Sequence, residues 1–417
     1  MILPLSANGP LRSTFSKTVS IMFKKFIHTL LISSAVLLVP AALAQTPQPQ
    51  PQPQAAAPLM PPAPTVAASS YLLIDADSGK VLVEHNADQP LPPASLTKMM
   101  TSYIASMEIL RGQLKETDQV LISEKAWRMG GSKMFIEVGN QVPVIDLLRG
   151  IIIQSCNDAS VAMAEHIAGS EDSFADLMNS HAKRLGMVNT HFENASGLPS
   201  ENHYSSARDM AIMAKAIIND DPEHYKLYKE KEYVWNGIRQ PNRNLMLWRD
   251  KSVDGLKTGH TEEAGYCLVA SAERDGMRLI SVVMGTVSEQ ARAAETQKLL
   301  TWGFRFFETK SFYQPGQVVA PARVWAGQAD QVDAGLAEGL VLTLPKGQAD
   351  KLEAGVTMNP VIKAPIAAGD VLGQVEVKLG EEVVHTAPLV ALADVEEAGL
   401  FGRLWDSIRL FFYGLFN

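Results

Sequence analysis

The sequence lacks the residue spacings that mark most metal and nucleotide sites. Its nine histidines form no HExxH motif or comparable ligand spacing, and it contains neither a Walker phosphate loop nor a GxGxxG dinucleotide fingerprint. Cationic side chains are also in deficit, with 37 Lys and Arg against 45 Asp and Glu, which gives a formal net charge of −8. An acidic chain binds nucleic acid poorly. We therefore expect no metal, no cofactor and no nucleic-acid partner.

Cysteine is almost absent, because Cys156 and Cys267 are the only two in 417 residues. An exported chain could oxidise such a pair to a disulfide, but the sequence does not fix the distance between their Cα atoms. Cys267 falls in an apolar stretch that is typical of a buried strand, where a free cysteine behaves as a small hydrophobic residue. We favour two free buried thiols and keep the disulfide as the alternative.

The apolar run near the start of the chain is too short to span a membrane comfortably. The run covers residues 26–39 and follows two lysines, Lys24 and Lys25. Ala-Leu-Ala at residues 42–44 is the pattern of a signal-peptide cleavage site. We therefore predict a signal peptide over residues 1–44, with Met1 or Met22 as the start. Its removal takes away four cationic side chains and no acidic one, so the net charge becomes −12.

A tether and then a folded body follow. Residues 45–65 are rich in Pro, Gln and Ala, a composition that cannot build a core. Hydrophobic residues make up 46% of the 417 residues, so the rest of the chain can bury a large core. Strand patterns at residues 71–84 and 265–284 flank helical patterns between residues 95 and 230. This order predicts one antiparallel sheet with helices packed on it.

Three short motifs point to catalysis by a serine nucleophile. They are SLTK at residues 95–98, SCN at residues 155–157 and KTG at residues 257–259. A serine hydroxyl needs a neighbouring base, and in a helix that starts at Ser95 the amine of Lys98 lies on the same face. An amine that is buried among other cations loses its proton more easily, which is how a lysine becomes a base.

The chain contains decoys with the same spacings, SHAK at residues 180–183 and SEN at residues 200–202. The first decoy lies in a polar stretch, which we interpret as solvated surface. By contrast, an apolar seam with helical spacing follows Ser95, and two prolines precede it. Context therefore assigns the nucleophile to Ser95, at a helix N-terminus that favours developing negative charge.

The KTG motif is expected on an edge strand ahead of the buried strand at residues 265–270. There Lys257 supplies positive charge, Thr258 supplies a hydroxyl, and Gly259 lets a substrate backbone approach closely. A solvated lysine on an edge strand is the alternative interpretation.

Together these motifs resemble the active-site motifs of the penicillin-recognising serine enzymes. Within that group the chain is similar to the low-molecular-mass penicillin-binding proteins, the D-alanyl-D-alanine carboxypeptidases, over residues 66–417. The matching stretches include PASLTKMM, NASGL, YSSARDM, KTGHT and LTWGF. The resemblance implies the α/β (α+β) fold of serine β-lactamases and penicillin-binding proteins, an antiparallel sheet with helices on both faces. One departure is Cys156, where the family often has glycine; a small residue should leave the site intact.

By the same resemblance, Ser95 is acylated, Lys98 is its base, and Ser155 and Lys257 pass protons to the leaving amine. Asn157 is expected to hold the substrate amide.

The resemblance also implies an oxyanion hole from the backbone N–H groups of Ser95 and His260. Thr258 and Arg292 are expected to bind the terminal carboxylate, since a guanidinium can meet a carboxylate with two hydrogen bonds. A surface position for Arg292 is the alternative.

The implied activity is that of a serine-type D-alanyl-D-alanine carboxypeptidase, which removes the last D-alanine from peptidoglycan stem pentapeptides and is inhibited covalently by β-lactams. A β-lactamase would share the motifs, but the Glu-x-x-x-Asn pattern of class A enzymes is missing around Glu193. A non-catalytic cell-wall-binding or morphology protein is expected to have lost a motif residue, and none is lost. Endopeptidase or transpeptidase side activities and the oligomeric state stay open.

We expect the catalytic domain over residues 66–310 and a small all-β domain over residues 311–397, which by resemblance acts as a pedestal. Residues 398–417 predict an amphipathic helix that lies in a membrane interface rather than crossing it, with packing on the body as the alternative. The enzyme would then sit peripherally on the periplasmic face of the cytoplasmic membrane. The apolar face of this helix comprises Phe401, Leu404, Trp405, Ile408, Phe411, Phe412 and Leu415.

Overall fold

The computed structural model of the chain describes residues 2–4 and 61–416. The predicted signal peptide, apart from the short strand β1 (Ile2–Pro4), and most of the predicted tether lie outside the described residues.

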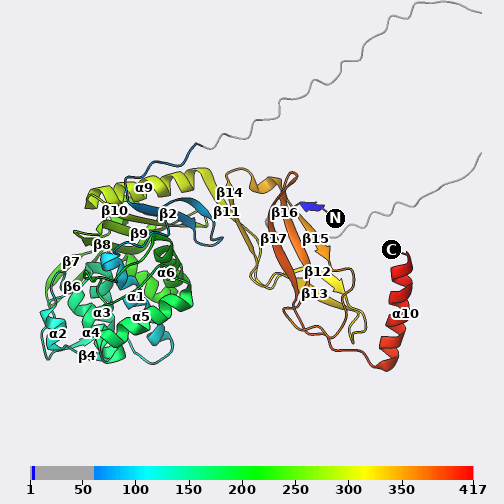
Figure 1. Ribbon diagram of the computed structural model, residues 1–417, viewed down its shortest axis with the longest axis horizontal. Helices are drawn as coiled ribbons and strands as arrows, with labels where there is room; N and C mark the ends of the chain where they lie inside the picture. Colours follow the sequence, from blue (N-terminus) through cyan, green and yellow to red (C-terminus); the bar gives the residue numbers. More distant parts are fainter. Residues whose placement is uncertain (1, 5–60, 417) are drawn as a thin grey trace, which may run out of the picture. The chain divides into compact units, whose positions relative to one another are not determined.

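The first folded part, here called the large domain, is built on a five-stranded antiparallel sheet in the order β3-β2-β10-β9-β8 (Figure 1). Its strands come from both ends of the domain, as the sequence predicted. The central strands are rich in Val, Ile and Leu, which pack well on a pleated surface. The strands are β2 (Ser70–Asp75), β3 (Val81–His85), β8 (Val253–Thr261), β9 (Gly265–Arg274) and β10 (Met277–Thr286).

Both faces of this sheet are covered by helices. Alternate residues of one strand enter different cores, as the two-residue period of a strand requires: Val282 lies in the core under the helical region, and Val283 lies in the core under α9 (Glu289–Phe306). Figure 1 shows α9 along one face of the sheet and other helices, among them α6 (Ala207–Asp220), on the opposite face. This arrangement confirms the predicted antiparallel sheet with helices on both faces.

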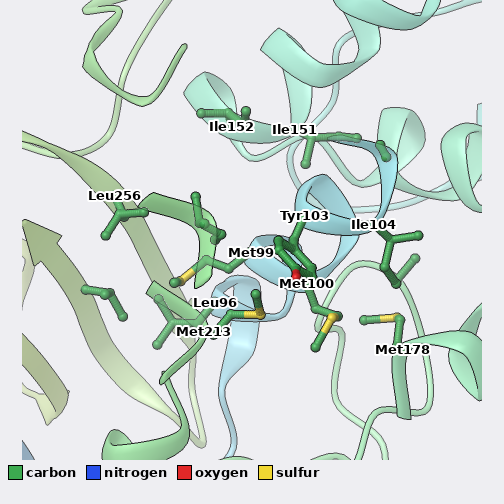
Figure 2. Close-up of a cluster of buried hydrophobic side chains, with 14 of the residues drawn as sticks. Leu96, Met99, Met100, Tyr103, Ile104, Ile151, Ile152, Met178, Met213 and Leu256 are labelled. Atoms are coloured by element: carbon green, nitrogen blue, oxygen red, sulfur yellow. The ribbon is translucent and has the colours of Figure 1, made fainter. Parts of the chain in front are cut away.

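The helix α1 (Lys98–Leu110) lies at the centre of the helical region. Its apolar side chains fall at a spacing of three and four residues, and Met99, Met100 and Ile104 are fully buried. Figure 2 shows these side chains packed against others from distant segments, among them Met178 and Leu256. The 3-10 helix η1 (Ala94–Thr97) runs directly into α1 and contacts β8, so the core fixes the position of the chain at Ser95.

The remaining elements of the large domain are short or peripheral, apart from the buried helices α4 to α6. They are β4 (Gln119–Leu121), α2 (Glu124–Arg128), β5 (Gln141–Pro143), α3 (Val144–Arg149), the π-helix η2 (Gly150–Gln154), α4 (Asn157–Ala168), α5 (Glu171–Leu185), α6 (Ala207–Asp220), α7 (Pro222–Tyr225), η3 (Lys226–Lys229), β6 (Glu232–Trp235), β7 (Ile238–Pro241) and α8 (Met246–Arg249).

A β domain with its own core follows α9. It holds a six-stranded sheet in the order β1-β15-β16-β17-β13-β12 and a two-stranded ribbon of β11 and β14. Val375, Val377 and Leu389 are fully buried in its core. Its elements are β11 (Phe307–Tyr313), β12 (Val318–Arg323), β13 (Gln331–Gly335), β14 (Leu340–Pro345), η4 (Ala349–Lys351), β15 (Leu352–Met358), β16 (Val371–Leu379) and β17 (Glu382–Ala391).

The last described element is the helix α10 (Leu400–Phe416), at the position of the predicted amphipathic helix. Its apolar face is open: Phe401 is 90% exposed and Trp405 is 62% exposed. On its opposite face the Asp406 carboxylate accepts a hydrogen bond of 2.8 Å from the backbone N–H of Ala326. Within the described part of the chain, no helix is long and apolar enough to cross a bilayer.

Among the described glycines of the large domain, Gly197 leaves the least room for a Cβ atom. It adopts φ +79°, and a Cβ at this position would lie 1.9 Å from the carbonyl oxygen of Ala94 and 2.8 Å from the Thr97 hydroxyl. Only glycine tolerates both the left-handed backbone and this contact. The residue therefore lets the 194–197 loop press directly against the turn that carries Ser95.

We predict that Gly197→Ala destabilises the protein far more than Gly186→Ala does. Gly186 has nearly the same φ, +81°, but an added Cβ there meets nothing within 4 Å. The control should therefore cost only about 1 kcal/mol of unfolding free energy for the left-handed backbone, whereas Gly197→Ala adds a steric clash and should cost about 3 kcal/mol or more. Urea unfolding of both variants measures the difference, and equal losses would contradict the role of the contact.

Candidate active site

Ser95 lies in the 3-10 helix η1, one turn ahead of α1. The sequence predicted an α-helix from Ser95, but the α-helix begins at Lys98 instead. The difference helps the site, because side chains at i and i+3 eclipse each other in a 3-10 turn. The Lys98 amine donates a hydrogen bond of 3.0 Å to the hydroxyl of Ser95. Ser95 itself is half-buried and remains open to a cavity.

Lys98 has no solvent exposure at all. Its amine donates to Asn157 Oδ1 at 2.7 Å and to the carbonyl oxygen of Ser196 at 2.5 Å, in addition to Ser95. Burial lowers the pKa of Lys98 to about 7, and the positive charge of Arg243 adds to this effect. An amine that is half neutral near neutral pH can accept a proton from the hydroxyl beside it.

The SCN motif sits at a junction between two helices. Ser155 follows the π-helix η2 with φ +66°, an unusual backbone for a residue other than glycine. Its hydroxyl is buried and has no hydrogen-bond partner in the described part of the chain. Asn157 is the first residue of α4, and its side-chain amide donates to the carbonyl oxygen of Gly130 at 2.8 Å. The Asn157 oxygen is thereby aimed at Lys98, and the Ser155 hydroxyl stays free for another partner.

The KTG motif lies on β8, which is the edge strand of the sheet, as predicted. Lys257 is not solvated, because only 2% of it is exposed and its amine donates to the carbonyl oxygen of Thr258. Burial, reinforced by the charges of Lys98 and Arg243, holds its pKa well below the usual value. Gly259 contacts the Ser95 segment, since a Cβ there would lie 2.8 Å from the carbonyl oxygen of Pro93.

These motifs meet at one cavity of about 220 Å³. Lys98 and Lys257 lie buried behind its wall. The seven other predicted site residues line it: Ser95, Ser155, Asn157, Thr258, Gly259, His260 and Arg292.

Two family models match the chain. The model described as D-alanyl-D-alanine carboxypeptidase covers residues 56–288, and the model of the penicillin-binding protein 5 C-terminal domain covers residues 307–397. The chain belongs to the D-alanyl-D-alanine carboxypeptidase family. The family resemblance predicted from the sequence is therefore confirmed.

Relatives in this family match over nearly their whole length. The D-alanyl-D-alanine carboxypeptidase DacA of Escherichia coli is 48% identical over 367 residues, which cover 86% of this chain and 91% of that protein. The crystal structures of penicillin binding protein 5 from Haemophilus influenzae match with a TM-score of 0.78 and 44% identity, over 81% of this chain and 99% of that one. Penicillin-Binding Protein D2 from Listeria monocytogenes, in its ampicillin-bound form, matches with a TM-score of 0.54 and 30% identity, over 58% of this chain and all of that one.

Arg292 belongs to α9 and lines the cavity. It is only 3% exposed, so the surface position considered from the sequence is wrong. One guanidinium N–H donates to the carbonyl oxygen of Gly259 at 3.2 Å. The guanidinium also lies over the ring of Tyr266, which in turn stacks on His260 with ring centroids 3.9 Å apart. Burial lowers the pKa of Arg292, but the opposing charge of Glu289 favours its cationic form.

Nine residues of the cavity wall were not among the predicted site residues, and three of them bring a charge or an aromatic ring to it. Tyr266 pairs directly with His260 across the turn between β8 and β9, so the hairpin register could have indicated it. Arg243 and Glu289 belong to no motif and reach the cavity only through the tertiary fold. These three are Arg243, Tyr266 and Glu289, and the other six are Gly131, Ser132, Ser196, Gly197, Leu198 and Thr261.

The decoy motifs and the cysteines behave as expected. The residues that would act in the decoys, Ser180 and Lys183 in one and Ser200 and Asn202 in the other, are all exposed.

Cys156 and Cys267 are buried free thiols, and burial raises the pKa of each. A thiol that is both buried and protonated is a poor nucleophile. This leaves Ser95 as the nucleophile that the geometry favours.

Proposed function

We propose that Ser95 is the nucleophile of a serine D-alanyl-D-alanine carboxypeptidase that acts on peptidoglycan stem peptides. The observation that carries this proposal is the 3.0 Å hydrogen bond between the Ser95 hydroxyl and the fully buried amine of Lys98. A neutral Lys98 takes the hydroxyl proton while Ser95 Oγ attacks the carbonyl carbon of the penultimate D-alanine. The backbone N–H groups of Ser95 and His260 would stabilise the resulting oxyanion.

Collapse of this intermediate breaks the peptide bond, and the departing amine needs a proton. The proton that Lys98 took from Ser95 is proposed to reach the amine by relay through Ser155 and Lys257. The unpaired buried hydroxyl of Ser155 supports this role because it is free to bond the leaving group. Water then attacks the acyl-enzyme ester and releases the shortened peptide together with a regenerated Ser95. A β-lactam would acylate Ser95 by the same attack.

Recognition of the substrate C-terminus is assigned to Thr258 and Arg292. Both line the cavity, and the Arg292 guanidinium is held in place by the carbonyl oxygen of Gly259 and by the ring of Tyr266. A preorganised guanidinium loses little conformational freedom when it binds a carboxylate. Asn157 would orient the substrate amide next to Ser95.

The test of the nucleophile uses the two SxxK sequences of the chain as a matched pair. Wild type should release D-alanine from a stem pentapeptide and should bind labelled penicillin covalently. Ser95→Ala should lose both activities, because no other hydroxyl in the described part of the chain is hydrogen-bonded to a buried lysine amine. Ser180→Ala, in the exposed decoy, should keep both. Labelling of Ser95→Ala at wild-type stoichiometry would refute the assignment.

The proposed base predicts the pH dependence of acylation. Lys98 acts when it is neutral, and burial lowers its pKa to about 7. The rate of penicillin acylation should therefore rise with pH up to about 7 and level off above it. Lys98→Ala should acylate more slowly by about two to four orders of magnitude, the usual contribution of a general base. Stopped-flow acylation between pH 5 and 9 measures both, and a flat profile would point to another base.

We further propose that the enzyme is exported and held at the membrane surface by α10. The helix exposes a continuous apolar face, and its Asp406 lies on the opposite side. Burial of a large apolar side chain contributes roughly 1.5 to 3 kcal/mol. The several side chains on this face therefore suffice for stable attachment.

Ending the chain after Glu397 should release the enzyme from membranes without loss of activity on a small peptide, because no described side chain of α10 belongs to either hydrophobic core of the large domain. A full-length variant with Phe401, Trp405 and Phe412 changed to Ser should behave in the same way. Sedimentation with lipid vesicles measures attachment, and D-alanine release measures activity. Truncated protein that still pellets as active enzyme would place the anchor elsewhere.

A further inference from the structure

The cavity wall contains one carboxylate among its described residues, and it belongs to Glu289. The residue is the first of α9, directly after the capping residue Ser288. The other charged residues of the wall are the cations Arg243 and Arg292. A lone acid in a site that receives an anionic substrate opposes binding, so its presence there calls for an explanation.

Glu289 contacts the arginine that is assigned to the substrate carboxylate. The distance between Glu289 Oε1 and the Arg292 guanidinium is 3.4 Å, at the long end of a hydrogen bond. The two side chains differ sharply in burial: that of Arg292 is 4% exposed and that of Glu289 is 56% exposed. The arginine is therefore fixed, whereas the glutamate can swing into solvent.

The fixed position of Arg292 has a second cause. Its other terminal nitrogen donates to the carbonyl oxygen of Gly259 at 3.2 Å, and its flat face lies over Tyr266. The guanidinium thus keeps its place whether or not Glu289 is present. What Glu289 changes is the charge and the hydrogen-bonding capacity that Arg292 offers to the cavity.

We propose that Glu289 is a specificity-determining residue that occupies Arg292 in the empty site and competes with the substrate's terminal carboxylate. This inference rests on the proposed function, in which Arg292 binds that carboxylate. A substrate with a free C-terminal carboxylate has to displace Glu289 or bind beside it. A substrate with a neutral C-terminus meets no such competition. Glu289 therefore reduces the advantage in affinity that a free carboxylate has over a neutral C-terminus.

The size of the effect follows from the exposure of the pair. Ion pairs with one exposed partner are weak, and charges at the surface are screened by salt. Releasing Arg292 from Glu289 should therefore improve the affinity for a free carboxylate by roughly two- to five-fold. The chemistry at Ser95 is not touched, so the gain belongs in KM and not in kcat.

The experiment compares wild type with Glu289→Gln, which keeps the shape of the side chain and removes its charge. The matched control is Glu262→Gln, which removes the same charge from an exposed position in the turn between β8 and β9, outside the cavity wall. Each protein is assayed on a peptide ending in D-Ala-D-Ala and on its C-terminal amide. We expect Glu289→Gln to lower KM for the free acid by roughly two- to five-fold, with kcat and the amide unchanged. The control should match wild type on both peptides.

The same comparison is made for binding, so that the inference does not depend on turnover. Binding is measured by calorimetry with the free-acid peptide in proteins that carry Ser95→Ala. Adding Glu289→Gln should lower the Kd by a similar factor, and this decrease should be smaller at high salt. Absence of D-alanine release from wild type would refute the proposed function alone, since this Kd ratio still reports on Glu289. The inference would be overturned if Glu289→Gln left KM and Kd for the free acid unchanged or raised them. It would also be overturned if the variant changed these constants equally for the amide, or if the peptide did not bind.

Discussion

The amine of Lys98 lies out of reach of water, and the architecture of the site follows from the need to satisfy it. Burying an amine costs free energy unless its N–H groups find acceptors. Here the acceptors come from three separate segments, with Ser95 in η1, Asn157 at the start of α4, and the carbonyl oxygen of Ser196 in a loop. If any of these segments moved away, an N–H group of the buried Lys98 amine would lose its acceptor. The hydrogen bond that is proposed to activate Ser95 therefore belongs to the same set of contacts that holds the cavity together.

Further buried contacts fix the segments that supply these acceptors. The Asp158 carboxylate, next to the SCN asparagine, accepts backbone N–H groups from residues 134 and 135 and so ties the start of α4 to the neighbouring loop. His203 links the nucleophile turn to the 193–197 loop: its Nδ1 accepts from the backbone N–H of Glu193, so its Nε2 carries the proton and donates to the Thr97 hydroxyl at 2.7 Å. Burial lowers the pKa of His203 to about 4, which keeps this pattern intact near neutral pH.

The sequence predicted those parts of the site whose geometry is local. Ser95 and Lys98 are three residues apart, so any helical turn brings them together, and the edge position of residues 257–259 followed from the strand pattern. The start of α1 was misplaced by three residues, because a 3-10 turn and an α-helical turn look alike in an apolar seam. Residues brought in by tertiary contacts carry no such signal. Arg243 and Glu289 reach the cavity in this way, whereas the hairpin register could have indicated Tyr266.

The edge strand β8 explains why residues from opposite faces of the sheet share one cavity. The turn with Ser95 packs against β8 from the helical side, and Arg292 of α9 reaches the same strand from the other side to bond the carbonyl oxygen of Gly259. In the middle of a sheet, neighbouring strands would keep the two layers apart. At an edge both layers meet the same strand, and Gly259 removes the last side chain that would separate it from the Ser95 turn. Ser95 and Arg292 are therefore both positioned by a single strand, so a change in the register of β8 would disturb both at once.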